Sequence, residues 1–147
     1  MTTRRKSRES ALQALFSIDM HDGQSGPWSD EEIERLDRMI EVPQASRDYF
    51  LELVKGVSRF LVDIDQCISD TSSNWKLSRM SAVDRNIIRI AVYEMRYRDD
   101  IPPAVAINEA IEVAKKFGTE KSGPFINGIL DNLYIHFIRN GQATDPQ

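Results

Sequence analysis

Two amphipathic segments joined by a short polar link, between Ile101 and Leu133, constrain the fold more than any other feature of the chain. A proline pair precedes them, and a helix can begin at Pro103 because proline fits the first helical turn. From there apolar residues recur at steps of three and four until Gly118, where a helix is expected to end. A second apolar pattern follows Ser122, the predicted N-cap. Two helices with so short a link predict a helical hairpin.

The link between these two helices also suits an anion. The N-terminus of the second helix offers unpaired backbone N–H groups and the positive end of its dipole. Lys115, Lys116 and Lys121 lie within a few residues of it, and Phe125 lies one turn inside the helix. A phosphate site beside an aromatic ring is typical of proteins that bind single-stranded nucleic acid. The alternative is a solvated loop with ordinary lysines.

The rest of the chain has the same helical periodicity, and no segment alternates with period two. The sequence therefore predicts an all-α fold with six to seven helices in two small helical bundles. The bundles are expected at residues 1–72 and 73–139, with a disordered tail at 140–147. Predicted helix starts include Asp30, after a capping box of Ser29 and Glu32, a long helix that begins at Ser46 and runs to Ile68, and a buried helix capped by Ser81.

Five residues point to particular tertiary contacts. Gly56 and Gly128 lie inside predicted helices, where glycine costs about 1 kcal/mol relative to alanine, so another helix is expected to approach each closely. Arg89 and Glu94 interrupt an apolar helix and need polar or charged partners. Trp75 is expected to anchor the connection before that helix in the core.

The charge distribution restricts where nucleic acid can bind. The net charge is −4, so binding requires a local basic patch rather than bulk attraction. Four cations, Arg4, Arg5, Lys6 and Arg8, precede the first acidic residue. They predict an RNA-binding cluster, and we expect their joint neutralisation to weaken RNA binding without a change in helicity. A flexible basic tail is the alternative. The acidic segment from Asp30 to Glu41 should repel phosphates and is excluded from the site.

The sequence offers little for catalysis. Its two histidines, His21 and His136, have no metal-ligand spacing, and Cys67 has no histidine nearby. No glycine-rich phosphate loop is present. We therefore expect no catalytic residue, no metal, no cofactor and no enzymatic activity. A lone cysteine fits a reducing compartment, and the lack of a long apolar run predicts a cytoplasmic protein without membrane contact.

The chain resembles the NusB family of transcription antitermination factors over nearly its whole length. The resemblance lies in RRKSRESALQALF (Arg4–Phe16), FLELVKGV (Phe50–Val57), WKLSRMSAVDRNIIRIAVYEM (Trp75–Met95), VAINEAIEVAKKFG (Val105–Gly118) and FINGILD (Phe125–Asp131). The order and spacing of the last two are specific. The acidic segment from Gly23 to Gln44 is not covered well.

This resemblance implies two small helical bundles that bind single-stranded box A RNA of ribosomal RNA leaders. It also implies two kinds of partner, NusE, a small-subunit ribosomal protein, and RNA polymerase with other Nus factors. Asp84 is the candidate contact for NusE. Lys121 replaces an acid that some members carry, so RNA binding is expected to be tighter or less selective. Family members differ in oligomeric state, which leaves a homodimer open. The implied RNA surface comprises Arg4, Arg5, Lys6, Arg8, Phe16, Lys115, Lys121, Ser122 and Phe125.

Two other functions stay open at this point. A similar helical domain forms the N-terminal RNA-binding part of some ribosomal RNA cytosine methyltransferases, so the chain can also be read as a stand-alone RNA-binding module. A protein–protein adaptor without RNA is the third possibility, which the basic cluster disfavours. Phe16 and Phe125 are interpreted either as stacking platforms for bases or as core residues.

Overall fold

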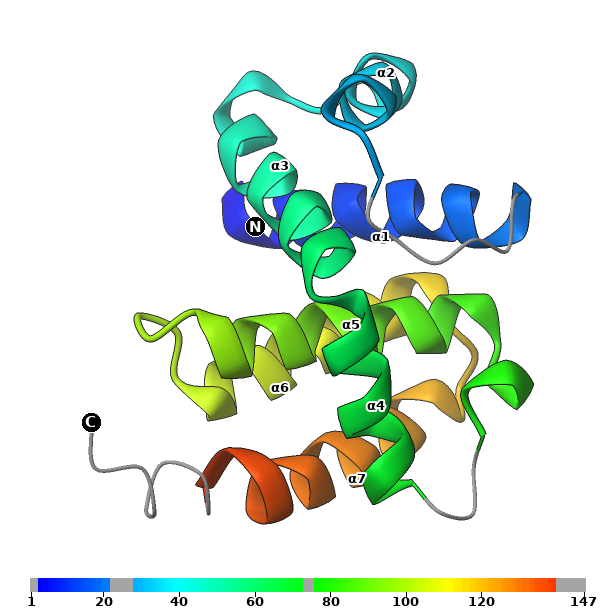
Figure 1. Cartoon of the computed structure of the whole chain (residues 1–147), viewed down its shortest axis with the longest axis vertical. Helices are drawn as coiled ribbons and strands as arrows, with labels where there is room; N and C mark the ends of the chain where they lie inside the picture. Colours follow the sequence, from blue (N-terminus) through cyan, green and yellow to red (C-terminus); the bar gives the residue numbers. More distant parts are fainter. Residues whose placement is uncertain (1–2, 22–27, 73–75, 140–147) are drawn as a thin grey trace.

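The computed structural model describes residues 3–21, 28–72 and 76–139, and these residues have the predicted all-α fold (Figure 1). Within the described ranges no residue lies in a β-strand, and no helix is long and apolar enough to cross a membrane. A 3-10 turn (Leu77–Arg79) precedes α5, and a π-helical turn (Tyr134–Arg139) follows α7. The seven α-helices of the described residues are α1 (Thr3–His21), α2 (Asp30–Ile40), α3 (Gln44–Arg59), α4 (Leu61–Thr71), α5 (Ala82–Tyr97), α6 (Pro103–Phe117) and α7 (Ser122–Leu133).

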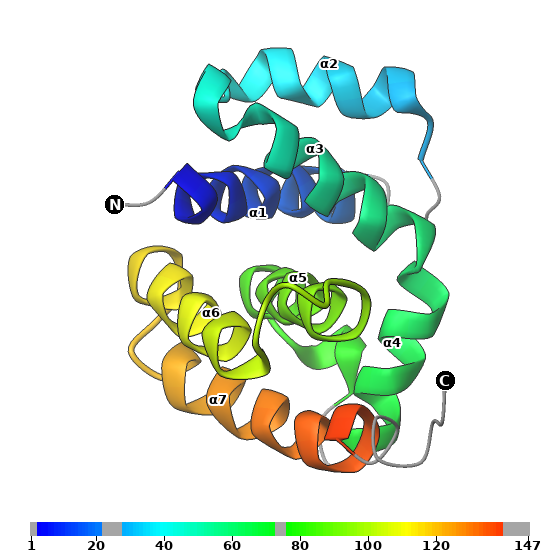
Figure 2. The same cartoon turned by 90° about the vertical axis from the view of Figure 1, so that its left-hand side faces the viewer.

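Helices α1, α2 and α3 pack against one another as the first bundle (Figure 2). The apolar face of α1 is fully buried, with Leu12 and Leu15 in the core. The predicted capping box starts α2, because Ser29 accepts from the backbone N–H of Glu32 and the Glu32 side chain accepts from that of Ser29. The two predicted starts, at Asp30 and at Pro103, are both confirmed.

The long helix predicted from Ser46 to Ile68 is wrong in two respects. It is two helices, since α3 ends at Arg59 and α4 begins at Leu61. Its N-cap is Pro43, while Ser46 is buried and donates its hydroxyl to the carbonyl of Thr3 at 3.0 Å. The break lets α4 leave the first bundle and pack against α5 and α7. The apolar spacing in the sequence continues across the break at Phe60 because α3 and α4 each bury one apolar face.

Helix α5 lies at the centre of the molecule and contacts α1, α3, α4, α6 and α7. Ile88 and Val92 are fully buried in it, as its almost continuous apolar sequence predicted. Ser81 caps it by accepting from the backbone N–H of Asp84 at 3.1 Å. In Figure 1, α1 and α6 run in the same direction, and α5 runs opposite to them. Because α4 packs mainly against α5 and α7, the second bundle consists of α4 to α7 and begins at Leu61 rather than at residue 73 as expected. Helix α5 is its bridge to the first bundle.

The two glycines that the sequence singled out have opposite surroundings. Gly56 packs against the ring of Tyr93, so its predicted close helix approach is confirmed between α3 and α5. Gly128 is exposed on α7, and a Cβ built there would meet no atom within 4 Å, so the same prediction is wrong for it. Trp75, predicted to anchor the connection before α5, lies outside the described residues.

These surroundings predict opposite effects of alanine. At Gly56 a Cβ overlaps the Tyr93 ring, which cannot shift freely because it lies in one aromatic cluster with Phe60 and Tyr97. Overpacking of this kind costs about 1–3 kcal/mol, so Gly56→Ala should lower the free energy of unfolding. Gly128→Ala is the matched control and should raise it by about 0.5–1 kcal/mol, since helix propensity alone changes. Urea denaturation followed by circular dichroism measures both, and equal gains would refute the packing argument.

Candidate nucleic-acid interface

Two of the four cations predicted at the start of α1 lie at the surface. Arg4 is exposed, and its guanidinium is 3.4 Å from the carboxylate of Asp100. The side chain of Lys6 is 38% exposed, and its ammonium is 3.9 Å from Glu9. Ion pairs this exposed and this long are worth about 1 kcal/mol or less, so an RNA phosphate can compete for both cations.

Arg5 is half-buried and held by α6. Its Nε and Nη2 donate to the two carboxylate oxygens of Glu109, at 3.0 and 2.8 Å. The hydrogen bond from Arg5 lowers the pKa of Glu109. A bidentate pair of this kind fixes the plane of the guanidinium. Arg5 thus stands at the edge of the surface with part of its donor capacity already used.

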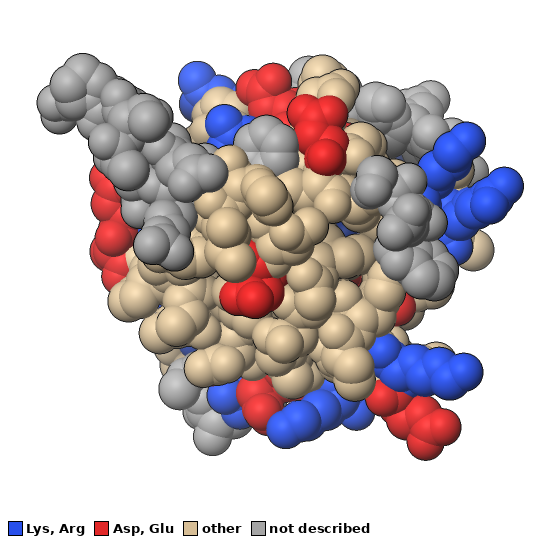
Figure 3. All heavy atoms as spheres, turned by 90° about the horizontal axis from the view of Figure 1, so that it is seen from below, with Lys and Arg blue, Asp and Glu red and all other residues tan. Residues whose placement is uncertain are grey.

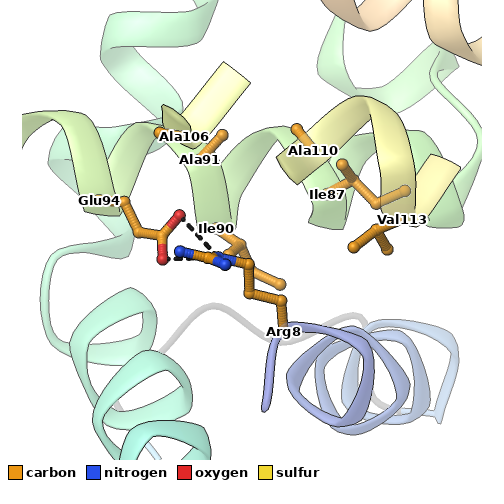
Figure 4. A pocket seen from close by; sticks show the side chains of 8 residues that line it. All are labelled: Arg8, Ile87, Ile90, Ala91, Glu94, Ala106, Ala110 and Val113. Carbon is orange, nitrogen blue, oxygen red and sulfur yellow. Dashed lines mark hydrogen bonds and ion pairs between the residues drawn. The ribbon is translucent and has the colours of Figure 1, made fainter. Parts of the chain in front are cut away.

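Arg8 is buried between the two bundles. Its Nε donates to Glu94 of α5 at 2.9 Å (Figure 4). Its Nη1 donates to Glu109 of α6 at 3.2 Å. The Tyr49 hydroxyl of α3 donates to the same Glu94 carboxylate. Burial raises the pKa of Glu94, and the charge of Arg8 opposes that rise. The predicted need of Glu94 for a charged partner is thereby confirmed. Because Arg8 is buried in this contact, we expect its neutralisation to affect stability, unlike that of the exposed Arg4.

The predicted need of Arg89 for charged partners is also confirmed. Its guanidinium donates two hydrogen bonds of 2.9 Å to Asp65 of α4 and a longer one to Asp19 of α1. Arg85 also donates to Asp19 at 2.9 Å. This network ties the far end of α1 to α4 and α5, which fixes the direction in which α1 crosses the second bundle.

The turn between α6 and α7 keeps two predicted lysines at the surface. Lys115 is exposed, pairs with Glu112 at 2.9 Å and lines an open hollow of about 670 Å³ between the two helices. Lys121 is exposed at the start of α7, where it is the N-cap. Ser122, the predicted cap, is buried and accepts from the backbone N–H of Thr119 at 3.0 Å. The cap prediction is therefore wrong, and the Ser122 hydroxyl holds the turn rather than facing solvent.

The two candidate stacking residues differ in exposure. Phe16 is 37% exposed on α1, so it is a surface residue and not part of the core. Phe125 is half-buried and packs against the core. It also lines a hollow of about 340 Å³ together with Lys121 and Asp84. The structure thus brings two residues predicted for RNA next to the residue predicted for NusE.

Asp84 has an unusual environment within this hollow. Its Oδ1 atom is buried and accepts no hydrogen bond from any residue that the structure describes. An unpaired buried carboxylate oxygen is costly, because nearly all buried polar atoms in folded proteins have a hydrogen-bond partner. Arg79, Met80 and Ser81 form the remaining wall of the hollow.

Lys116 is a surface cation that the predicted site residues did not include. It donates to Glu9 of α1 at 3.1 Å, whereas Lys115 points to the hollow beside α7. The neighbouring lysines therefore lie on different sides of α6. The sequence contains a signal for this, because Glu109, Val113 and Lys116 follow one another at steps of four and three, and Glu109 and Val113 both face inward.

The outer face of α7 differs from the surface along α1 and α6. Figure 3 shows the molecule from that side, and its centre is largely free of lysine and arginine, which lie around its margin.

In residues 3–21, 28–72 and 76–139 there is no group of three or more histidine, cysteine or acidic side chains that could hold a metal ion. Cys67 is buried, and burial raises the pKa of its thiol.

Known proteins share both the sequence and the fold. A profile of the NusB family matches residues 5–134. The transcription antitermination protein NusB of Desulfosudis oleivorans is 47% identical over 133 residues, which are 90% of this chain and 86% of that protein. The protein of the same name from Geobacter sulfurreducens is also 47% identical over 133 residues, covering 90% of this chain and 94% of that protein.

Among solved structures, NusB from T. maritima is 35% identical, with a TM-score of 0.78 over 97% of this chain and 98% of that one. A chain in the crystal structure of antitermination factors NusB and NusE in complex with dsRNA has the same fold, with a TM-score of 0.78, 24% identity and coverage of 93% and 99%. The family match extends over nearly the whole chain, and both NusB relatives align with 90% of it. This chain belongs to the NusB family.

Proposed function

We propose that this chain is a transcription antitermination factor that binds single-stranded box A-type RNA of ribosomal RNA leaders together with NusE, on RNA polymerase and with other Nus factors. In this proposal it is a cytoplasmic binding protein and catalyses no reaction. Support comes from family membership and from the antitermination function that the curated relatives carry in their names. A chain of the same fold was solved in a complex of NusB and NusE with dsRNA, which supports RNA and NusE as classes of partner, whereas the choice of a single strand rests on the surface described next.

One observation carries the RNA part of the proposal. Cations from opposite ends of the sequence meet along α1 and α6, because Arg5 is bonded to Glu109 and Lys116 is bonded to Glu9. Arg4 and Lys6 extend this surface at the start of α1, and Phe16 supplies an exposed ring on the same helix. Cations that follow a backbone, with a ring for stacking, suit a single strand better than a duplex.

Docking of NusE is proposed at the hollow beside Asp84. Asp84 lines this hollow, and its carboxylate accepts no hydrogen bond at Oδ1 from the described residues, so its charge is available to a partner seated there. Lys121 and Phe125 line the same hollow, so RNA and NusE would meet there.

Substitution of Phe16 tests the RNA part. Base–aromatic stacking contributes about 1–3 kcal/mol, so Phe16→Ala should weaken binding of a fluorescein-labelled box A RNA by that amount in an anisotropy titration. The matched control is Met20→Ala, which removes an apolar side chain that is 61% exposed four residues further along α1. If both variants bind like the parent, Phe16 is not a base contact. If the parent itself does not bind RNA at low salt, the protein is an adaptor and the proposal is wrong.

A further inference from the structure

Helices α1 and α6 each supply one lysine to the same buried carboxylate. The ammonium of Lys6 is 3.9 Å from Oε1 of Glu9, and that of Lys116 is 3.1 Å from the same atom. The lysine side chains are 38% and 51% exposed, whereas that of Glu9 is 3% exposed. The carboxylate therefore lies beneath the two ammonium groups and does not face solvent.

This arrangement gathers two positive charges at one point of the surface. Because both distances end on one oxygen, the two nitrogens are at most about 7 Å apart. Charge-assisted hydrogen bonds of about 2.8 Å to different oxygens of one phosphate can bridge such a gap. The three side chains together carry one net positive charge, so an anion is attracted even with Glu9 ionised.

We infer that Lys6 and Lys116 together bind one backbone phosphate of the RNA, and that Glu9 is the positioning residue that holds them side by side. This inference rests on the proposed function and assigns a particular phosphate-binding site within it. The sequence placed Lys116 near the link between α6 and α7 but not in the implied RNA surface, and Glu9 was not predicted as a site residue.

The neighbouring cations are less suited to share a phosphate. Lys115 pairs with Glu112, whose side chain is 38% exposed and would face the same anion. Arg5 already gives two donors to Glu109. At Glu9, by contrast, the acid is covered and the donors are exposed, so a phosphate meets ammonium groups before it meets the carboxylate. The Lys116 ammonium also lies 5.5 Å from the centre of the Phe117 ring, a further contact that limits its positions.

A double-mutant cycle tests whether the two lysines share one phosphate. Lys6→Gln, Lys116→Gln and the double variant are titrated with a box A RNA at several salt concentrations. For single strands the slope of log K against log salt changes by about 0.7 per phosphate contact. We expect the double variant to lose about 0.7 in slope, and its loss of affinity to be smaller than the product of the two single losses. Independent losses with a slope change of about 1.4, or no loss in any variant, would overturn the inference.

Glu9→Gln tests the positioning role, because glutamine keeps the volume and removes the charge. In that background the two lysines repel each other without a shared counter-ion, so the effects of Lys6→Gln and Lys116→Gln should become independent. Persistence of the coupling would exclude Glu9 as the positioning residue. A melting curve for each variant confirms that it folds. Lys55→Gln is the charge-matched control, since Lys55 lies on α3 and pairs with Asp30 of the acidic segment. A parent protein that binds no RNA refutes the proposed function itself, whereas binding that ignores only these lysines refutes this inference.

Discussion

Replacement of Arg8 by alanine should lower the free energy of unfolding by about 3–5 kcal/mol, the cost of breaking a buried ion pair from one side. The side chains of Arg8 and Glu94 are 6% and 1% exposed, so the variant leaves a carboxylate buried without its guanidinium. Glu109 loses a donor as well. Small domains are stable by about 5–15 kcal/mol, and the expected loss is therefore a large part of the total.

Two further variants make this expectation specific. Arg4→Ala is the control on the same helix, because its pair with Asp100 is about half exposed and should contribute no more than about 1 kcal/mol. The double variant Arg8→Met with Glu94→Leu removes both charges together and should restore most of the stability. Urea denaturation of the four proteins gives the comparison. If Arg8→Ala unfolds at the same urea concentration as Arg4→Ala, the ion pair is not structural.

The free energy of unfolding that Arg8→Ala loses relative to the parent, here called the deficit, should also depend on pH. Burial raises the pKa of Glu94 above its ordinary value of 4.5, and removal of Arg8 takes away an opposing charge. A carboxyl group whose pKa is higher in the folded state favours folding when it is protonated and disfavours it when it ionises. The deficit should therefore be smaller at pH 4 than at pH 7. A deficit that grows on acidification would contradict this account.

Affinity for box A RNA should rise by about 10²-fold when NusE is present, because the two ligands then bind through adjoining surfaces at high effective concentration. The proposed cations are few, and most of them already have a carboxylate neighbour, so the protein alone should bind RNA modestly at physiological salt. The hollow that Asp84 shares with Lys121 and Phe125 is where the second ligand would add contacts to the same strand.

Linkage makes this prediction testable from both sides. If NusE tightens RNA binding, RNA must tighten NusE binding by the same factor. RNA is titrated into the protein with and without saturating NusE, and NusE is titrated with and without saturating RNA. Asp84→Asn should reduce both factors equally. Affinities that are unchanged by the other ligand would leave a simple RNA-binding module and exclude cooperative assembly.

Local sequence signals predicted the helices well where a helix has a specific start. The capping box at Ser29 and the proline at 103 begin α2 and α6, because both signals act within one turn of the chain. The break at Phe60 was missed, since apolar spacing reports that a residue is buried but not against which bundle. Gly128 misled for a related reason. A glycine inside a helix is compatible with close packing of another helix but does not require it, and only the structure distinguishes Gly56, which contacts Tyr93, from Gly128, which has open space.

The site residues also divide into those that local sequence predicts and those whose position depends on long-range packing. Arg4 and Lys6 were predicted from the cationic start of α1, and the structure keeps them at the surface. Arg8 has the same chemistry but is buried, because its position depends on Glu94, which lies 86 residues further along the chain. Lys115 belongs to the RNA surface that the sequence predicts, whereas its neighbour Lys116 does not. Only the crossing of α6 with α1 distinguishes them, and that crossing is set by long-range packing.

The ion pairs of Arg5 and Arg8 have a consequence for biosynthesis. The first three helices are synthesised before Glu94 and Glu109, the carboxylates that pair with Arg8 and Arg5. At about 5–20 residues per second, the nascent first bundle waits for seconds with unpaired guanidinium groups on its open face. During that interval the start of α1 carries guanidinium groups without their final partners, and those partners are complete only when α6 has been translated.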